Sequence, residues 1–255
     1  QKNSKNKFFS SLLKSNIYSS NNIVITEIID SKTILFEEKN GRGWVLVSNS
    51  IVNDVNFIYK GFTQKNGYVN SKDRLNKHGL TGCLNLYNIT FANATIIAKN
   101  TNCEDAVNII NSNGNISNIN ISKTHSDGLD IDFSNLNIIK ANVNNSGNDC
   151  IDLSAGSYSF NTVSILNCPD KSFSIGESSI VNIEDIALEN SDIGIAIKDS
   201  SKLTLNNFYG KSLNTCISAY NKKQEFRGGE ALINKFNCLV ENEVIVDQFS
   251  RVTIK

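Results

Sequence analysis

Pairs of aspartate residues recur at a fixed interval in the middle of the chain. Asp127 and Asp130 are followed 22 residues later by Asp149 and Asp152, and Asp105 stands 22 residues before Asp127. Neighbouring carboxyl groups raise one another's pKa unless cations or amides compensate, and such pairs suit general acid and base catalysis. The spacing therefore predicts a carboxyl-rich site in which Asp127 and Asp149 are candidate catalytic residues.

Lysines follow the aspartates along the chain. Lys171 stands 22 residues after Asp149, and Lys198 falls on the same expected surface one repeat further on. Amines beside carboxylates on a rigid surface suit general acid–base chemistry, so Lys171 and Lys198 join the candidate catalytic residues. An outer wall neutralised by ordinary ion pairs is the alternative, because such networks also occur without catalysis.

The same carboxylates could hold a hard cation. Calcium prefers about six to eight oxygen ligands, and aspartate side chains supply only oxygen. Calcium is therefore the one cofactor that the sequence suggests. The candidate ligands are Asp127, Asp130, Asp149 and Asp152.

Two polar segments could bring further groups to this surface. One interrupts the repeats at residues 60–78, and the other follows them at residues 220–229. Long loops on repeat proteins often wall a binding groove, although a solvated excursion is the alternative. The candidate substrate-binding residues from the repeats and these loops are Asp152, Asn148, Lys222, Tyr220 and His78.

Apolar residues show how the repeats would position these groups. They alternate within each repeat, and equivalent positions hold Leu129, Ile151, Phe173, Ile195 and Ile217. Alternation with a period of two is typical of strands, and a fixed period of about 20 to 50 residues is typical of solenoids. A second alternating segment in each repeat, with Gly, Asn and Ser between, predicts an all-β, right-handed parallel β-helix of about 22 residues per coil. The handedness follows the general crossover rule.

The β-helix is expected to span residues 21–255, with the loop insertion at 60–78. Residues 1–20 are expected to form an N-terminal cap with a short helix, because their apolar residues share one helical face. A cap would protect the open edge of the first coil from pairing. The apolar residues of this segment are Phe8, Phe9, Leu12 and Leu13. The chain is expected to be part of a longer protein.

Composition argues against two classes of partner. Lys and Arg number 25 and Asp and Glu number 25, so no net field would attract nucleic acid or an anionic membrane. No run approaches the roughly 18 apolar residues of a membrane-spanning helix. The expected partner is therefore neither a nucleic acid nor a lipid bilayer.

The six cysteines allow two interpretations. Cys216 and Cys238 stand one repeat apart, within the reach of a disulfide across stacked strands. We favour the other interpretation, small buried residues in a packed ladder, because free cysteine is commonly buried. The remaining cysteines show no zinc-ligand spacing with either histidine.

Four motifs occur in order along the repeats: Asp127-Gly-Leu-Asp130, Gly147-Asn-Asp149-Cys-Ile, Lys171-Ser-Phe-Ser-Ile-Gly176 and Ala196-Ile-Lys198. Their order resembles that of the polygalacturonases in the pectin-lyase-like β-helix superfamily. The resemblance implies that Asp127 is one catalytic carboxylate, that Asp149 is the general acid and that Lys198 grips a uronate. The chain departs from that family in having Asn148, Lys171 and Ala196 in place of Asp, His and Arg.

A longer succession of motifs, across residues 75–230, includes Glu104-Asp-Ala-Val-Asn-Ile109 and Asp170-Lys-Ser-Phe-Ser-Ile-Gly-Glu177. It resembles right-handed β-helix modules of microbial proteins, some of which are attached to CotH-type kinase domains. This resemblance implies the fold more strongly than an activity.

These features together predict a secreted or cell-surface β-helix protein that acts on, or binds, an acidic polysaccharide containing uronates. Turnover could be β-elimination, with calcium acidifying a proton that a lysine abstracts, or hydrolysis by two carboxyl groups. The alternative is a non-catalytic structural or adhesion module that binds glycan or calcium along the acidic surface.

Overall fold

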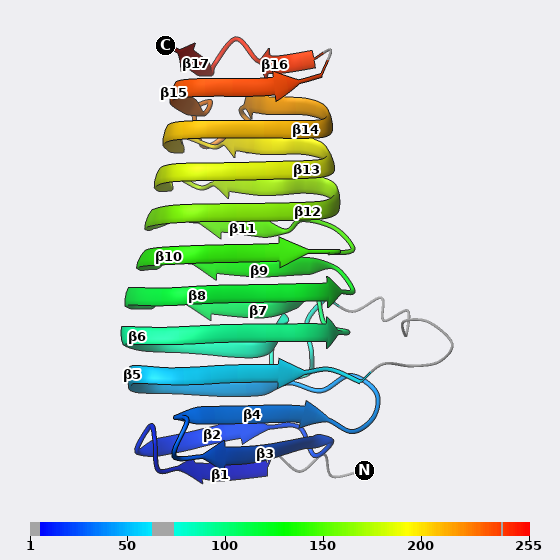
Figure 1. The fold of residues 1–255 in the computed structure, drawn as a ribbon, viewed down its shortest axis with the longest axis vertical. Coiled ribbons are helices and arrows are strands. Elements are labelled where there is room, and N and C mark those ends of the chain that lie inside the picture. Colours follow the sequence, from blue (N-terminus) through cyan, green and yellow to red (C-terminus); the bar gives the residue numbers. More distant parts are fainter. Residues whose placement is uncertain (1–5, 63–73, 241) are drawn as a thin grey trace.

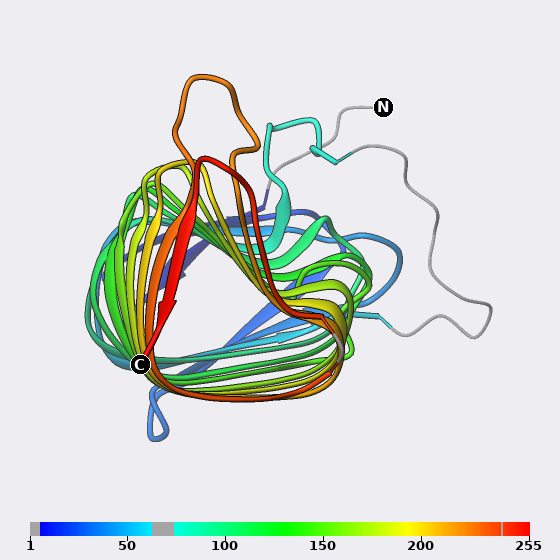
Figure 2. The same ribbon diagram turned by 90° about the horizontal axis from the view of Figure 1, so that it is seen from above.

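The computed structural model describes residues 6–62, 74–240 and 242–255. These residues form a parallel β-solenoid of about 9 turns, with about 22 residues per turn and no helix in the described part. Figure 1 shows the turns stacked along one axis, and Figure 2, viewed down that axis, shows the strands of successive turns in register. The predicted all-β solenoid is therefore confirmed.

Seventeen strands make up the described part. They are β1 (Asn6–Ser10), β2 (Ser15–Ser19), β3 (Ile23–Ile28), β4 (Thr33–Glu38), β5 (Val45–Lys60), β6 (Gly82–Thr101), β7 (Asp105–Ile110), β8 (Asn113–Thr124), β9 (Asp127–Asp132), β10 (Asn135–Asn144), β11 (Ile151–Ser154), β12 (Ser157–Gly176), β13 (Ile180–Lys198), β14 (Lys202–Tyr220), β15 (Glu230–Leu239), β16 (Asn242–Val246) and β17 (Arg251–Ile254).

The predicted apolar ladder forms the core of the solenoid. Ile151 pairs with Leu129 on one side and Phe173 on the other, and Ile195 continues the row to Ile217. All five side chains are fully buried. Because side chains alternate along a strand, this register places the residues between the ladder positions on the outer surface.

Asparagine shapes one corner of the turns. Asn145, Asn167 and Asn190 adopt left-handed backbone conformations, with φ values of 56°, 60° and 62°. Their side-chain amides form a ladder, with Asn167 donating to Asn145 at 2.9 Å and Asn190 donating to Asn167 at 2.6 Å. Asparagine tolerates this backbone better than most residues, so the corner repeats without strain.

The predicted N-terminal helix is wrong for the residues that the structure describes. β1 and β2 form an antiparallel hairpin, in which Phe8 pairs with Ile17, and β2 pairs in turn with β5. The turn between them ends at Lys14, whose φ is 51°. The spacing of the four apolar residues fits a hairpin as well as a helix, and strand pairing satisfies the open backbone edge of the first turn. Phe9 remains exposed, whereas Leu13 is buried.

All six cysteines form disulfides, which corrects the preference for a packed ladder of free thiols. The pairs are Cys83–Cys103, Cys150–Cys168 and Cys216–Cys238, with Cα separations of 5.3, 5.7 and 6.3 Å. Only the last pair joins equivalent positions of adjacent turns, 22 residues apart. The other two close shorter loops of 20 and 18 residues.

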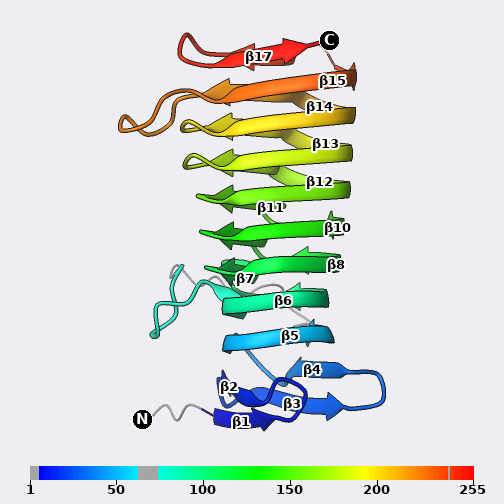
Figure 3. The same ribbon diagram turned by 90° about the vertical axis from the view of Figure 1, so that its left-hand side faces the viewer.

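The insertion predicted at 60–78 falls between β5 and β6. Residues 63–73 lie outside the described part, so Tyr68 and Lys72 have no described position. Residues 74–81 form a loop that leads into β6, and a second loop, 221–229, follows β14. Figures 2 and 3 show that both loops project from the same side of the solenoid, at different heights along its axis. No helix in the described residues is long and apolar enough to cross a bilayer.

Candidate functional site

The aspartates and lysines gather on one strand face of the solenoid, which we call the Asp–Lys face. It consists of the outward side chains of the stacked segments 105–110, 127–132, 149–154, 171–176, 193–198 and 215–220. One row of this face, the central row, contains Asn108, Asp130, Asp152, Ser174, Ala196 and Ser218 in backbone register. The sequence period predicted this alignment, and the pairing register confirms it.

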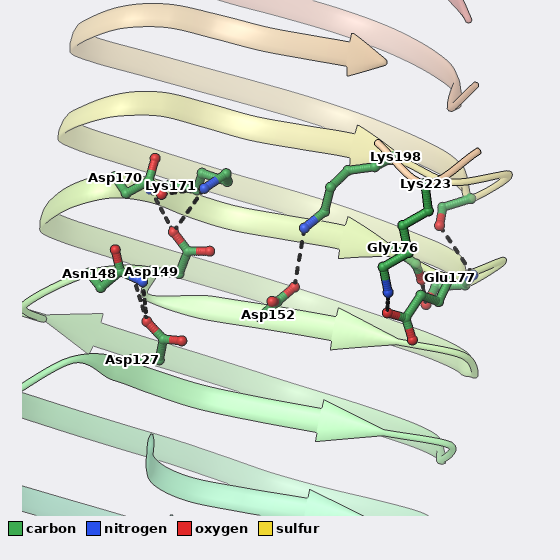
Figure 4. A network of polar contacts seen from close by, with 12 residues as sticks. Asp127, Asn148, Asp149, Asp152, Asp170, Lys171, Gly176, Glu177, Lys198 and Lys223 are labelled. Atoms are coloured by element: carbon green, nitrogen blue, oxygen red, sulfur yellow. Dashed lines mark hydrogen bonds and ion pairs between the residues drawn. The ribbon is translucent and has the colours of Figure 1, made fainter. Parts of the chain in front are cut away.

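Asp127 and Asp149 lie in successive turns and are linked through hydrogen bonds. One carboxylate oxygen of Asp127 accepts the side-chain amide of Asn148 at 2.7 Å and the backbone N–H of Asp149 at 2.9 Å. The carboxylate of Asp149 accepts the backbone N–H of Lys171 at 3.0 Å. Each carboxylate thus reaches toward the next turn, and Figure 4 shows this arrangement. The structure brings together three of the four predicted catalytic residues here.

Burial changes the acidity of both carboxyl groups. It raises the pKa of Asp127 from 3.8 to about 7, although hydrogen bonds from Asn148 and the Asp149 backbone oppose the change. Burial also raises the pKa of Asp149, to about 6, and the nearby Lys171 ammonium opposes it. Two neighbouring carboxyl groups therefore titrate close to neutral pH, where proton transfer in either direction is accessible.

Further carboxyl groups extend the face toward the N-terminal turns. Burial raises the pKa of Asp105 and of Asp132 to about 6, and that of Asp130 well above its usual range, and their mutual repulsion adds to the effect. The amide of Asn108 donates to Asp105 at 3.2 Å and reaches Asp130 at 3.5 Å. This end of the face is rich in carboxyl groups that burial holds partly protonated.

Lys171 is held by two carboxylates. Its ammonium lies 3.4 Å from Asp149 and also pairs with Asp170. Burial lowers the pKa of Lys171, but the hydrogen bond and charge of Asp170 and the charge of Asp149 outweigh it, so the pKa lies above its ordinary value. Lys171 is therefore a protonated partner of Asp149.

Lys198 is buried, with only 8% of its side chain exposed, and its ion pair is loose. Its ammonium lies 3.9 Å from the Asp152 carboxylate. A Cβ placed on Gly176 would stand 3.4 Å from Lys198 Cε, so the lysine side chain crosses the outer face of β12 to reach β11. Figure 4 shows this path.

The loop after β14 folds back toward the face. Tyr220, a predicted binding residue, is the last residue of β14 and lies at the base of this loop. Tyr220 is paired in register with Lys198, and its pKa is raised by burial while the Lys171 charge opposes the change. Lys222 is exposed, but its backbone N–H binds the buried Asp199 at 2.9 Å. This buried carboxylate anchors the base of the loop.

An ion pair between Lys223 and Glu177 also fastens this loop to the face. The two residues are 46 apart in the sequence. Lys223 lies in the segment that the sequence predicts to approach this face, but no local sequence signal links it to Glu177. Figure 4 shows Lys223 reaching Glu177, the residue that follows Gly176 in the chain.

His78 lies near the N-terminal turns, away from Asp149 and Asp152 of the Asp–Lys face. Its ring lies 4.8 Å from the ring of Trp44, and both line a cavity of about 300 Å³ against the N-terminal turns. Val45 and Ile151 are four strand spacings apart in the stack, which is about 19 Å. The predicted role of His78 in binding at this face is therefore not supported.

The carboxylates are not arranged as a metal site. Within residues 6–62, 74–240 and 242–255, no three His, Cys, Asp or Glu side chains are grouped so that they could hold one ion. Asp127, Asp130, Asp149 and Asp152 spread over two turns, and hydrogen bonds from protein groups already occupy Asp127 and Asp149. Calcium binding remains a prediction that this geometry does not support.

A cavity of about 790 Å³ adjoins the face at the asparagine corner. Its lining is polar and includes His125, Gly147 and Pro169. Gly147 and Pro169 directly precede Asn148 and Asp170 in the chain, so the cavity and the start of the Asp–Lys face are neighbours. The polar lining of the cavity thus continues at the start of the Asp–Lys face.

No protein family, no curated protein and no solved structure matched this chain.

Proposed function

We propose that the Asp–Lys face binds an acidic polysaccharide and hydrolyses it, with Lys198 holding a uronate carboxylate. The observation that carries the proposal is the state of Lys198: an ammonium group that is buried on an outer strand face and only loosely paired, at 3.9 Å. A buried charge is normally paired at short distance, because desolvation is costly. An anionic ligand would supply the missing partner.

The two linked carboxyl groups supply the chemistry of hydrolysis. Asp149 would donate its proton to the glycosidic oxygen, so that the bond to the leaving sugar breaks, while the ionised Asp127 removes a proton from the attacking water. This requires one protonated and one ionised carboxyl group near neutral pH. The pKa values, about 6 for Asp149 and about 7 for Asp127, place both groups near neutral pH but favour the proton on Asp127. The form with the proton on Asp149, which this mechanism uses, is therefore the minor one of two forms that exchange because the groups interact.

β-Elimination has less support. It requires an amine that is neutral near pH 7 so that it can abstract a proton. The carboxylates of Asp170 and Asp149 raise the pKa of Lys171 above its ordinary value, so this lysine stays charged. Lys171 is therefore a poor base, and the Asp127–Asp149 pair makes hydrolysis the better-supported reaction.

The wider assignment rests on the architecture and the disulfides. The parallel solenoid and the ordered motifs at 127–130, 147–151 and 196–198 support membership of the pectin-lyase-like β-helix group. Three disulfides are compatible with an oxidising, extracellular location, because they persist there and are rare in the cytosol. Secretion or display at a cell surface is part of the proposal.

The test measures binding and cleavage of a panel of uronate polymers by calorimetry and reducing-sugar release. Lys198→Ala should abolish binding, because it removes the ammonium from the face. Lys202→Ala is the matched control, since Lys202 is exposed and pairs with Glu230 at 3.7 Å away from the site. If the unmutated protein neither binds nor cleaves any member of the panel, a structural or adhesion module becomes the better assignment.

A further inference from the structure

Three buried polar atoms without a hydrogen-bond partner lie in the central row of the Asp–Lys face. They are the side-chain oxygens Asn108 Oδ1, Asp152 Oδ1 and Ser174 Oγ. Unsatisfied buried polar atoms are rare in folded proteins, because each has lost its contacts with water. Their concentration in one outward row indicates groups that are satisfied by a bound molecule.

Ser174 is the most informative of the three. It is fully buried, and it lies in register between Asp152 on β11 and Ala196 on β13. Its side chain points outward, since Phe173 and Ile175 on either side belong to the core. The Lys198 side chain crosses this stretch of β12 on its way to Asp152, so the hydroxyl and the ammonium share one patch.

We propose that Ser174 and Lys198 together bind one uronate carboxylate, and that the acidic turns beside them exclude a second, so that the ligand is a polysaccharide in which uronates alternate with uncharged sugars. This inference rests on the proposed function and adds its substrate class. Because Ser174 is fully buried, the incoming carboxylate has to displace the Lys198 side chain that crosses this stretch of β12. It then takes the loose place of Asp152 at the Lys198 ammonium and accepts a hydrogen bond from Ser174 Oγ. Asp152 is then released to accept a sugar hydroxyl.

The exclusion of a second uronate carboxylate follows from the charges on the N-terminal side of Ser174 and Lys198. Asp152 stacks on Asp130 in the preceding turn, and Asp105 and Asp132 lie close to Asp130. On the same N-terminal side, the guanidinium of Arg74 already pairs with Glu104 at 2.8 Å. Asp105 and Asp132, whose pKa values are about 6, are mostly ionised near neutral pH, so a carboxylate on the neighbouring sugar would meet like charges at short range. Hydroxyl groups on that sugar would instead find hydrogen-bond acceptors.

Ser174→Ala tests the carboxylate site. The substitution removes an unpartnered buried hydroxyl, so the urea midpoint should stay the same or rise. Affinity for a uronate-containing oligosaccharide, measured by calorimetry, should fall about tenfold or more, because hydrogen bonds to charged groups are strong. A purely structural role would give the opposite pattern, with lower stability and unchanged affinity. Unchanged affinity with unchanged stability would also overturn the assignment of Ser174.

A second comparison tests the substrate class. Oligosaccharides of equal length are titrated into the protein: a pure oligouronate, and one in which a uronate alternates with a neutral sugar. The alternating ligand should bind at least tenfold more tightly, and Asp132→Asn should narrow the difference by strengthening binding of the pure oligouronate. Asp185→Asn, which alters an exposed aspartate bound by Asn207 at 2.8 Å, should leave the ratio unchanged.

The outcomes separate the two proposals. If neither ligand binds, the proposed function itself fails. If both bind equally and Asp132→Asn leaves their ratio unchanged, the face still binds uronates, but the inference of an alternating polymer is overturned.

Discussion

Replacing Asp127 by asparagine should stabilise the protein at alkaline pH and leave it unchanged in acid. Burial raises the pKa of Asp127 from 3.8 to about 7 in the folded state. A pKa difference of about three, at about 1.4 kcal/mol for each unit, corresponds to roughly 4 kcal/mol of stability. The folded protein binds this proton more tightly than the unfolded chain does. The contribution of Asp127 to the free energy of unfolding is therefore fully present below about pH 4, falls as the pH rises toward 7, and is lost above it.

Asparagine preserves the local contacts while removing the charge. Its side-chain oxygen can still accept the amide of Asn148 and the backbone N–H of Asp149, which Asp127 accepts at 2.7 and 2.9 Å. At pH 8 the variant should gain as much as about 4 kcal/mol over the unmutated protein. At pH 4 the two should agree, because Asp127 is then protonated and asparagine resembles it in shape and charge.

Urea unfolding between pH 4 and pH 8, with the disulfides intact, measures this difference. The control is Asp185→Asn, at an exposed aspartate that also accepts one asparagine amide. The control should show no pH-dependent gain, because its charge remains in water. The reasoning is refuted if Asp127→Asn is destabilising at pH 8, since the ionised carboxylate would then be favoured by its hydrogen bonds rather than penalised by burial.

Three other substitutions probe the fold and the chemistry. Ile151→Ala should lower the free energy of unfolding by about 2 to 5 kcal/mol, measured with urea, because it leaves a cavity in the apolar ladder. Replacing both Cys83 and Cys103 by alanine should cost about 3 kcal/mol in the same assay, because the disulfide closes a loop of 20 residues. Asp149→Asn should stop reducing-sugar release while calorimetry still detects glycan binding, because only the proton donor is lost; equal loss of both would contradict its role as an acid.

The repeat made the solenoid predictable. A strict period fixes the register of every strand, so Leu129 and Ile151 could be placed in one ladder before their contacts were known. The N-terminal segment lies outside the repeat and lacked that constraint. Its apolar residues, Phe8 to Leu13, fit a helical face and a hairpin equally, and pairing with β5 decided the outcome.

The disulfides show a second limit of the repeat. Cys216 and Cys238 occupy equivalent positions, so their pairing could be considered from the sequence. Cys150 pairs instead with Cys168, 18 residues away, which is less than one turn. Such a bond joins a strand to a corner, and its geometry depends on the path of the corner rather than on the period. The sequence alone could not decide that pairing.

The rows of the candidate site could be predicted from the sequence, but the burial of its side chains could not. The period aligned Asp127 with Asp149 and located Lys171 beside them. Burial of these groups depends on side chains from other turns, as does the loose pairing of Lys198, and neither has a local sequence signal. The Lys223–Glu177 contact depends on the return path of a loop.

The cost of these buried carboxyl groups bears on whether the face is functional. The row of Asp127 and Asp149 continues with Ile193 and Thr215, and the central row contains Asn108 and Ser174, so the solenoid accommodates uncharged side chains in both rows. Carboxyl groups at Asp127 and Asp149 instead destabilise the folded protein near neutral pH, since burial raises their pKa values. A structural module would gain stability from asparagine at both positions and lose nothing. Costly carboxyl groups on the same face as a buried, loosely paired lysine are typical of active sites, where stability is given up for chemistry. The carboxyl pair therefore favours the hydrolase over the structural module.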